Sequence, residues 1–180
     1  MVLPLERIYF GDMRGDPGLH YTLNLHLQAY VFAHRFIHKK SVLDAACGTC
    51  FGTMIFSTAC KKIIGVDKDK EAIQYGKDRL TFCCPSKFLV KDLNEDELPK
   101  TDVCVSIETI EHLRPDNKFL KKLKADELIF TVPLNMPGVF HLVSYESPQQ
   151  FDTYLKKCGW EPKEQLIGEN HMLLGRAVRA

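Results

Sequence analysis

The chain has 180 residues, 45% of which are hydrophobic, and its formal net charge is only +1. This is enough apolar material for one compact domain with a sizeable core, and the near-neutral charge argues against a broad basic surface for nucleic acid. The seven cysteines show no secreted disulfide framework, and the sequence has neither a signal-peptide pattern nor an apolar run long enough to cross a bilayer. We therefore expect a cytoplasmic protein.

The N-terminal part of the chain is predicted to form a helical cap or lid over residues 1–40. Glycines and a proline interrupt its first 20 residues, whereas apolar residues recur at helical spacing over 22–37. The remainder, 41–180, is predicted to form the core of a single domain, in which short apolar runs alternate with helical segments. Strands are expected at 41–46, 62–67, 86–91, 102–107 and 127–132, helices at 52–60, 69–80, 116–124 and 147–158, and a closing hairpin at 160–167 and 171–179.

This alternation predicts the fold class, which is α/β with a Rossmann-like, doubly wound and mostly parallel sheet that helices cover on both faces. The closing hairpin adds an antiparallel C-terminal strand. In open sheets of this kind a ligand lies beyond the carboxyl ends of the strands, at the switch in strand order. Polar residues that directly follow the predicted strands are therefore the candidates for a site.

The most informative motif covers residues 42–52, which read VLDAACGTCFG. A short apolar run ends at Asp44, a turn of small residues follows, and a second apolar run ends at Asp67, 19 residues after Gly48 (67 − 48). Small residues let the backbone approach a ligand, and an acid at the end of the second strand accepts hydrogen bonds from two ribose hydroxyls. The motif predicts a nucleotide-binding crossover. Cys47 and Cys50 also form a C-x-x-C sequence, for which a redox site is the alternative interpretation.

The spacing from Asp44 to Gly52, D-x-A-x-G-x-C-x-G, resembles motif I of the class I S-adenosylmethionine-dependent methyltransferases, with Ala46 and Cys50 in place of two glycines. An acid at the head of the turn suits an ammonium group and would repel a pyrophosphate. The resemblance implies methyltransferase topology and S-adenosyl-L-methionine as cofactor, with S-adenosyl-L-homocysteine as product. It implies that Asp44 lies at the amino-acid end of the cofactor, Asp67 on the ribose and Asp92 at the adenine. The other cofactor-binding residues that it implies are Ala46, Cys47, Gly48, Lys68, Leu93, Ile107 and Tyr30.

A second motif, ETIEHL at residues 108–113, follows the fourth predicted strand. It resembles the E-x-x-E-H-L signature of a methyltransferase branch that includes the ubiquinone-biosynthesis O-methyltransferases. The resemblance implies methyl transfer to a small-molecule or glycan-type acceptor, at oxygen and without a metal. A hydroxyl acceptor requires a base, for which His112 and His141 are the candidates. The usual K-P-G-G turn before the fifth strand is replaced by residues 123–126, LKAD, which suggests a trimmed protein with a small substrate-side cap.

Two alternative functions remain open. In the small-RNA 3′-terminal 2′-O-methyltransferases, an E-x-x-E-H motif and a later histidine hold magnesium, and Glu108, Glu111, His112 and His141 resemble that set. The chain lacks a basic, aromatic-rich surface for RNA, so neither nucleic acid nor a membrane is the expected partner. The other alternative is a cofactor-binding module without turnover, which Cys50 in motif I and the missing glycine turn both allow.

Overall fold

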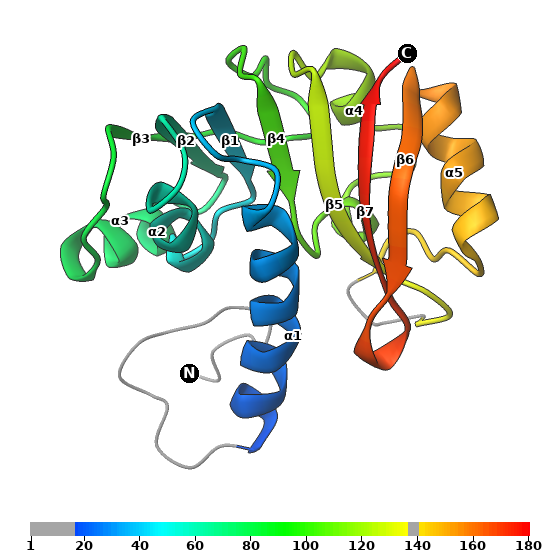
Figure 1. Cartoon of the computed structure of the whole chain (residues 1–180), viewed down its shortest axis with the longest axis horizontal. Coiled ribbons are helices and arrows are strands. Elements are labelled where there is room, and N and C mark those ends of the chain that lie inside the picture. The colour runs from blue at the N-terminus through cyan, green and yellow to red at the C-terminus, as the bar shows by residue number, and fades with distance from the viewer. Residues whose placement is uncertain (1–16, 137–140) are drawn as a thin grey trace.

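A computed structural model describes residues 17–136 and 141–180 of the chain (Figure 1). Its centre is one seven-stranded sheet with the strand order β3-β2-β1-β4-β5-β7-β6. The strands are β1 (Ser41–Ala45), β2 (Lys62–Asp67), β3 (Ser86–Val90), β4 (Val103–Ser106), β5 (Glu127–Pro133), β6 (Trp160–Ile167) and β7 (Met172–Arg179). The helices are α1 (Pro17–His34), α2 (Phe51–Ser57), α3 (Lys70–Arg79), α4 (Phe119–Lys122) and α5 (Pro148–Lys157), with 3-10 turns η1 (Ile110–His112) and η2 (Glu169–His171).

The strand directions confirm the predicted fold class. Strands β1 to β5 pair in parallel, whereas β7 runs antiparallel to both β5 and β6. The chain moves outward from β1 through β2 to β3 and then returns to β4 on the other side of β1. The switch in strand order therefore lies between β1 and β4, and the crevice above their carboxyl ends is where a doubly wound sheet binds its ligand.

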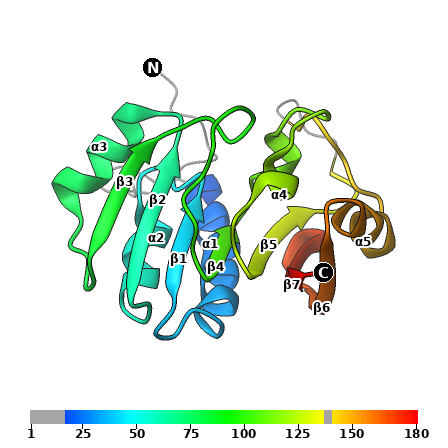
Figure 2. The ribbon, with the colours of Figure 1, turned by 90° about the horizontal axis from the view of Figure 1, so that it is seen from above.

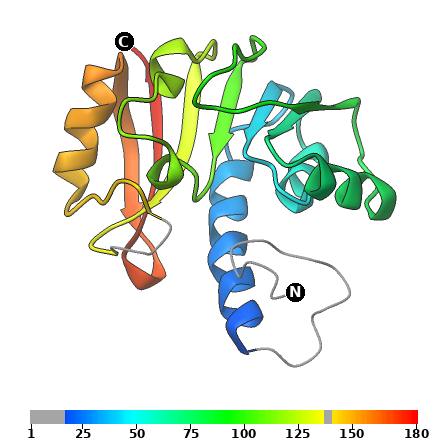
Figure 3. The ribbon, with the colours of Figure 1, turned by 180° about the vertical axis from the view of Figure 1, so that it is seen from behind.

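Alternating residues of the central strands supply two hydrophobic cores, one on each face of the sheet. Val42, Val103 and Val105 pack with α1 and α2, whereas Leu43 and Cys104 pack with α4 and α5. The helices α4 and α5 accordingly lie behind the sheet in Figure 1 and in front of it in Figure 3. Figure 2 shows α3 and α5 at opposite ends of the sheet. Both faces are thus covered, as expected for a parallel sheet.

The observed elements differ from the expected ones in two places. The first helix already begins at Pro17, five residues before the expected start, and its second half packs into the core through Tyr30, Phe32 and Ala33. The helix expected over 116–124 shrinks to the single turn of α4, because an irregular stretch rich in charged and polar residues precedes it. The division into a cap over 1–40 and a core over 41–180 stays a prediction, since residues 1–16 lie outside the described part. Within the described residues, no helix is both long and apolar enough to span a bilayer.

Helix α3 approaches the turn after β1 so closely that only a glycine fits at the contact. A Cβ atom added to Gly76 would lie 2.2 Å from the carbonyl oxygen of Thr49 and 2.8 Å from the Cβ of Cys50. Backbone atoms cannot rotate away as a flexible side chain could. The glycine in the middle of α3 therefore fixes how the helix sits against the turn.

We predict that Gly76→Ala destabilises the protein by about 1–3 kcal/mol, because the added methyl group forces α3 away from the turn. Helix propensity alone would give the opposite sign, since alanine in a helix interior is favoured over glycine by about 1 kcal/mol. Urea unfolding followed by circular dichroism measures the difference. Gln74→Ala, on the exposed face of the same helix, is the control and should change stability little. A stabilised Gly76→Ala protein would show that the close approach does not constrain the helix.

Candidate functional site

The turn between β1 and α2 alternates left-handed residues with ordinary ones. Ala46, Gly48 and Cys50 have φ values of 61°, 51° and 65°. This region favours glycine, and a side chain there costs about 1–2 kcal/mol. The three positions coincide with the three glycines of the motif that the sequence resembles, so the spacing has a conformational cause. Small residues at 46 and 50 are the tolerated substitutes.

Backbone and side-chain hydrogen bonds attach this turn to the end of β2. The amide of Cys47 donates to the carbonyl oxygen of Val66 over 2.9 Å, and the amide of Gly48 donates to Asp67 Oδ2 over 2.8 Å. Asp67 Oδ1 accepts from the amide of Asp69, also over 2.8 Å. Asp67 is only 5% exposed, so its carboxylate is held in one orientation at the crevice. A carboxylate oxygen accepts more than one hydrogen bond, which leaves capacity for ligand hydroxyls.

Asp44 is a buried acid at the carboxyl end of β1. It is 7% exposed, and the hydroxyl of Thr53 in α2 donates to its Oδ2 over 2.5 Å. Burial raises the pKa of Asp44 to about 7, the Thr53 hydrogen bond opposes this rise, and the charge of Asp67 adds to it. Thr53 was not among the residues predicted from the sequence. The only signal for Thr53 in the sequence is a hydroxyl in the first turn of the helix that follows Asp44.

Asp92 follows β3, which is the edge strand beside β2. Its Oδ1 accepts from the amide and side-chain nitrogens of Asn94, over 2.8 and 2.9 Å. The amide of Asn94 is the main cause that lowers the pKa of Asp92, and the charge of Lys68 contributes, so the segments after β2 and β3 adjoin. Leu93 is buried beside Asp92, and Ile107, at the end of β4, is half-buried. The structure thus brings Asp44, Asp67 and Asp92 to three neighbouring strand ends.

Tyr30 reaches the turn from α1. Its ring is 8% exposed and packs edge-on against Phe51 and Phe56, with centroids 5.8 and 5.6 Å away. Burial raises the pKa of Tyr30, and the charge of Asp44 raises it further, which places the phenol on the Asp44 side of the turn. Room for the ring depends on Gly52, where an added Cβ would lie 2.9 Å from the ring. The Tyr30 ring therefore covers the start of α2, directly after the turn.

The two cysteines of the C-x-x-C sequence do not have the features of a redox site. Cys50 is fully buried, and its Sγ lies 3.8 and 3.9 Å from the carbonyl oxygens of Gly48 and Ile73, so the thiol packs against α3. The pKa of Cys47 is raised well above its usual range by the neighbouring Cys50 thiol, by burial and by Asp44. Reactive cysteines have lowered pKa values and accessible sulfur atoms. The geometry favours a packing role for both residues.

The two candidate bases come together with a buried carboxylate. Ligand atoms of Glu111, His112 and His141 all lie within 4.8 Å of one another, and the two imidazole rings are 5.0 Å apart between centroids. His112 Nε2 is 3.8 Å from Glu111 Oε1, and Glu111 is 1% exposed. His141 Nδ1 lies 2.7 Å from the carbonyl oxygen of Met136 and donates to it, because a carbonyl oxygen can only accept.

Glu108 does not belong to this cluster. Its Oε1 accepts from the hydroxyl of Thr131 over 3.0 Å, and its backbone amide donates to the same hydroxyl over 2.9 Å. The resemblance to a four-ligand magnesium set therefore holds for three of the four residues. The cluster lies near the end of β1, because the hydroxyl of the adjacent Thr109, which donates to the carbonyl oxygen of Ile107 over 2.9 Å, is 3.5 Å from the carbonyl oxygen of Ala45.

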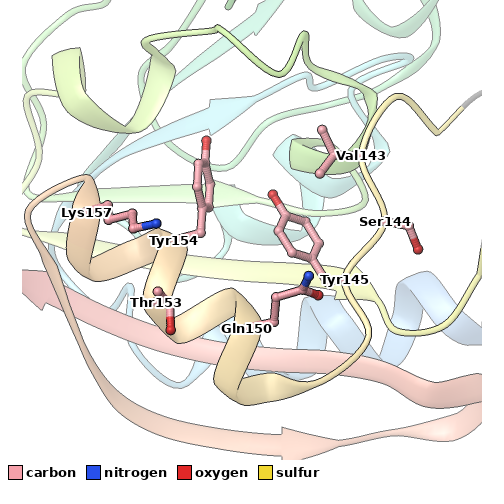
Figure 4. Close-up of a pocket in the computed structure, with 7 residues that line it drawn as sticks. All are labelled: Val143, Ser144, Tyr145, Gln150, Thr153, Tyr154 and Lys157. Carbon is pink, nitrogen blue, oxygen red and sulfur yellow. The ribbon is translucent and has the colours of Figure 1, made fainter.

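A cavity of about 320 Å³ lies beside this cluster, between α5 and the segment at 143–145 (Figure 4). Tyr145 and Tyr154 stand side by side in it, and the Lys157 ammonium points toward Tyr154. Val143, which lines the cavity, donates its backbone amide to the carbonyl oxygen of Glu111 over 3.1 Å, so the cavity adjoins the cluster. The lining residues are Val143, Ser144, Tyr145, Gln150, Thr153, Tyr154 and Lys157.

Comparison with known sequences finds similarity to methyltransferases over the first part of the sheet. The family model described as "Methyltransferase domain" matches residues 42–125. A "Probable S-adenosylmethionine-dependent methyltransferase" of Mycobacterium tuberculosis is 29% identical over 87 residues, which make up 46% of this chain and 30% of that protein. The chain thus matches less than a third of the length of this curated relative.

Solved structures share the fold at low sequence identity. The 1,6-didemethyltoxoflavin-N1-methyltransferase of Burkholderia thailandensis, solved with its didemethylated toxoflavin and S-adenosylhomocysteine, is 16% identical with a TM-score of 0.71, covering 90% of this chain and 81% of that one. The magnesium protoporphyrin IX methyltransferase of Synechocystis, solved with the same product, is 14% identical with a TM-score of 0.69, covering 91% and 85%. These likenesses show a methyltransferase-type sheet.

We predict that Asp44→Asn removes a pH dependence of stability. The folded pKa of Asp44, about 7, lies above its ordinary value of 3.8, so the folded state holds the proton more tightly than the unfolded state. The free energy of unfolding should therefore fall as pH rises from about 5 to about 8, by roughly 2–3 kcal/mol from this group. Urea unfolding at these pH values measures the fall, which should be absent from Asp44→Asn and retained in the exposed-site control Asp116→Asn. An equal fall in all three proteins would assign it to other groups.

Proposed function

We propose that the chain is an S-adenosylmethionine-dependent methyltransferase, that its acceptor is a small molecule or a sugar, and that the methyl group goes to oxygen. The observation that carries the proposal is the set of three acids, Asp44, Asp67 and Asp92, at adjacent strand ends around a left-handed turn. The family match over 42–125 supports the same cofactor. A cytoplasmic location is part of the proposal.

The donor chemistry of the three acids fits each part of this cofactor. Asp44, buried and close to half ionised near neutral pH, suits a ligand ammonium, because an opposite charge favours the carboxylate form. Asp67 suits a pair of ribose hydroxyls, since its carboxylate is held at the crevice by two backbone amides. Asp92, whose pKa is lowered chiefly by the Asn94 amide, stays ionised and suits an amino group of adenine.

S-adenosylmethionine, when bound, supplies a methyl group that its sulfonium has already activated. The chain's own residues then have to hold the acceptor in line and exclude water. A hydroxyl acceptor loses a proton on methylation, and an imidazole within hydrogen-bond reach can take it. His112 is the proposed base, with Glu111 Oε1 3.8 Å from its Nε2 as the orienting group, and His141 is the neighbouring candidate.

A metal-assisted reaction is the second candidate function, and the specific observation in its favour is the Glu111–His112–His141 cluster. Two imidazoles and a carboxylate form a donor set that suits zinc, manganese or iron better than magnesium, which prefers oxygen. An RNA 3′ end is the acceptor that the resemblance attaches to this reaction. A cofactor-binding module without turnover is the third possibility, and product formation separates it from both enzymes.

We predict that Asp67→Ala weakens S-adenosylmethionine binding about 30- to 1,000-fold, because about 2–4 kcal/mol of charge-assisted hydrogen bonding is lost. Isothermal titration calorimetry with the cofactor and with S-adenosylhomocysteine measures the effect. Asp116→Ala, which removes an exposed acid, is the matched control. Circular dichroism separates a lost ligand contact from a lost fold, since Asp67 also anchors the turn. Unchanged affinity in a folded Asp67→Ala protein would show that the site is wrongly placed.

We predict that His112→Ala lowers methyl transfer about 10²- to 10⁴-fold while cofactor affinity changes little, because a base acts on the acceptor. Turnover is measured as S-adenosylhomocysteine release with a panel of hydroxylated metabolites and sugars. His38→Ala, which removes an exposed histidine at the opposite edge of the sheet, is the control. Chelators should have no effect. Activity that a chelator abolishes and a divalent metal restores would favour the metal-assisted reaction, and equal turnover in His112→Ala would remove this residue from the mechanism.

A further inference from the structure

Two thiols face each other at the amino-terminal edge of the sheet, away from the strand ends that form the candidate site. Cys60 follows α2, and Cys84 precedes β3, 24 residues later in the chain; their Sγ atoms are 3.4 Å apart. A disulfide bond is about 2.05 Å long, so the sulfur atoms are about 1.4 Å too far apart for a bond. We propose that Cys60 and Cys84 are a site of reversible thiol–disulfide exchange with a small disulfide such as glutathione disulfide.

The backbone around both cysteines is held in place by hydrogen bonds to neighbouring elements. The amide of Cys83 donates to the hydroxyl of Ser57, at the end of α2, over 2.9 Å. The amide of Ile63 donates to the carbonyl oxygen of Pro85 over 3.0 Å, and the amide of Lys61 donates to that of Lys40 over 2.8 Å. The two segments therefore stay adjacent, and side-chain rotation is the movement that brings the sulfur atoms together.

Access and charge assign different roles to the two thiols. Cys84 is half-buried and lies beside the exposed Cys83, whereas Cys60 is 7% exposed. Lys61, Lys62 and Lys87 are exposed at the same edge. Exposed lysines at this edge attract glutathione disulfide, which is an anion. Cys84 is therefore the thiol that reacts first. Burial and the neighbouring thiol raise the pKa of Cys60 to about 12, so Cys60 reacts second and more slowly.

The exchange proceeds in two balanced steps. The thiolate of Cys84 attacks one sulfur of glutathione disulfide, the S–S bond of that molecule breaks, and one glutathione thiolate leaves and takes up a proton. Cys60 then loses its proton to solvent and attacks Cys84 Sγ, which expels the second glutathione. Two protein thiols are oxidised and one glutathione disulfide is reduced to two glutathione molecules. Excess glutathione reverses both steps.

The other close cysteine pair provides an internal comparison. Cys47 and Cys50 are neighbours in the turn after β1, but they are 8% and 0% exposed, and the pKa of Cys47 is raised well above its usual range. Neither thiol of this pair is accessible to an oxidant, whereas Cys84 of the other pair is half-buried. Cys104 and Cys158 are also buried. The structure therefore favours thiol–disulfide exchange at Cys60 and Cys84 over exchange at the C-x-x-C pair.

The test equilibrates the full chain in glutathione buffers from fully reduced to fully oxidised, traps free thiols by alkylation, and maps cross-linked peptides by mass spectrometry. We expect a Cys60–Cys84 cross-link at least tenfold more abundant than any other pair. Cys83→Ser should retain this cross-link, and Cys84→Ser should abolish it. Cys60→Ser should stop at the first step, with glutathione attached to Cys84. The oxidised parent should also unfold at a higher temperature than the reduced parent, because the cross-link constrains the unfolded chain.

Three outcomes would overturn the proposal. The first is a dominant Cys47–Cys50 or Cys83–Cys84 cross-link in the parent protein. The second is glutathione attached to Cys84 that persists in the parent without a cross-link. The third is a thermal shift on oxidation that Cys60→Ser shows to the same extent. None of these readouts depends on the cofactor or on methyl transfer, so the result is independent of the proposed enzymatic function.

Discussion

The carboxylate of Asp67 is the anchor on which the geometry of the site depends. One oxygen holds the Gly48 amide and so fixes the turn, and the other holds the Asp69 amide at the start of α3. Asp69 in turn caps α3 by accepting from the amides of Glu71 and Ala72. A single buried side chain thus joins the end of β2, the turn after β1 and the first turn of α3. Helix α3 then returns to the turn at Gly76, which closes the arrangement.

The two acids at the crevice create a local need for positive charge. Asp44 and Asp67 are both less than 8% exposed, and the charge of Asp67 disfavours ionisation of Asp44. The Thr53 hydroxyl offsets only part of the desolvation of Asp44, so the pKa of Asp44 remains raised. A ligand cation beside Asp44 would restore the ionised form and release a proton near neutral pH. The site therefore suits a cation, which would remove the destabilisation that the ionised form of Asp44 causes above about pH 7.

The grouping of acids at the strand ends could be predicted from the sequence, because the carboxyl ends of parallel strands lie at the same edge of the sheet. An acid after each apolar run was sufficient to group Asp44, Asp67 and Asp92 without any knowledge of side-chain packing. The histidine cluster has a weaker sequence signal, since His112 and His141 are 29 residues apart (141 − 112). Their meeting depends on backbone bonds from Leu142 and Val143 to the carbonyl oxygen of Glu111, and nothing in the residue pattern specifies those. The contact between Cys60 and Cys84 is hidden in the same way, because it depends on how the loop before β3 lies against α2.

Cys50 shows how the fold accommodates a departure from the glycine pattern. The left-handed conformation at this position costs about 1–2 kcal/mol for a residue with a side chain. The side chain lies between the turn and α3, where it is completely buried beside Ile73. The Cβ of Cys50 would be 2.8 Å from a Cβ at position 76, so the side chain at position 50 requires the missing one at 76. The glycine that the motif loses in the turn is thus matched by one in the helix.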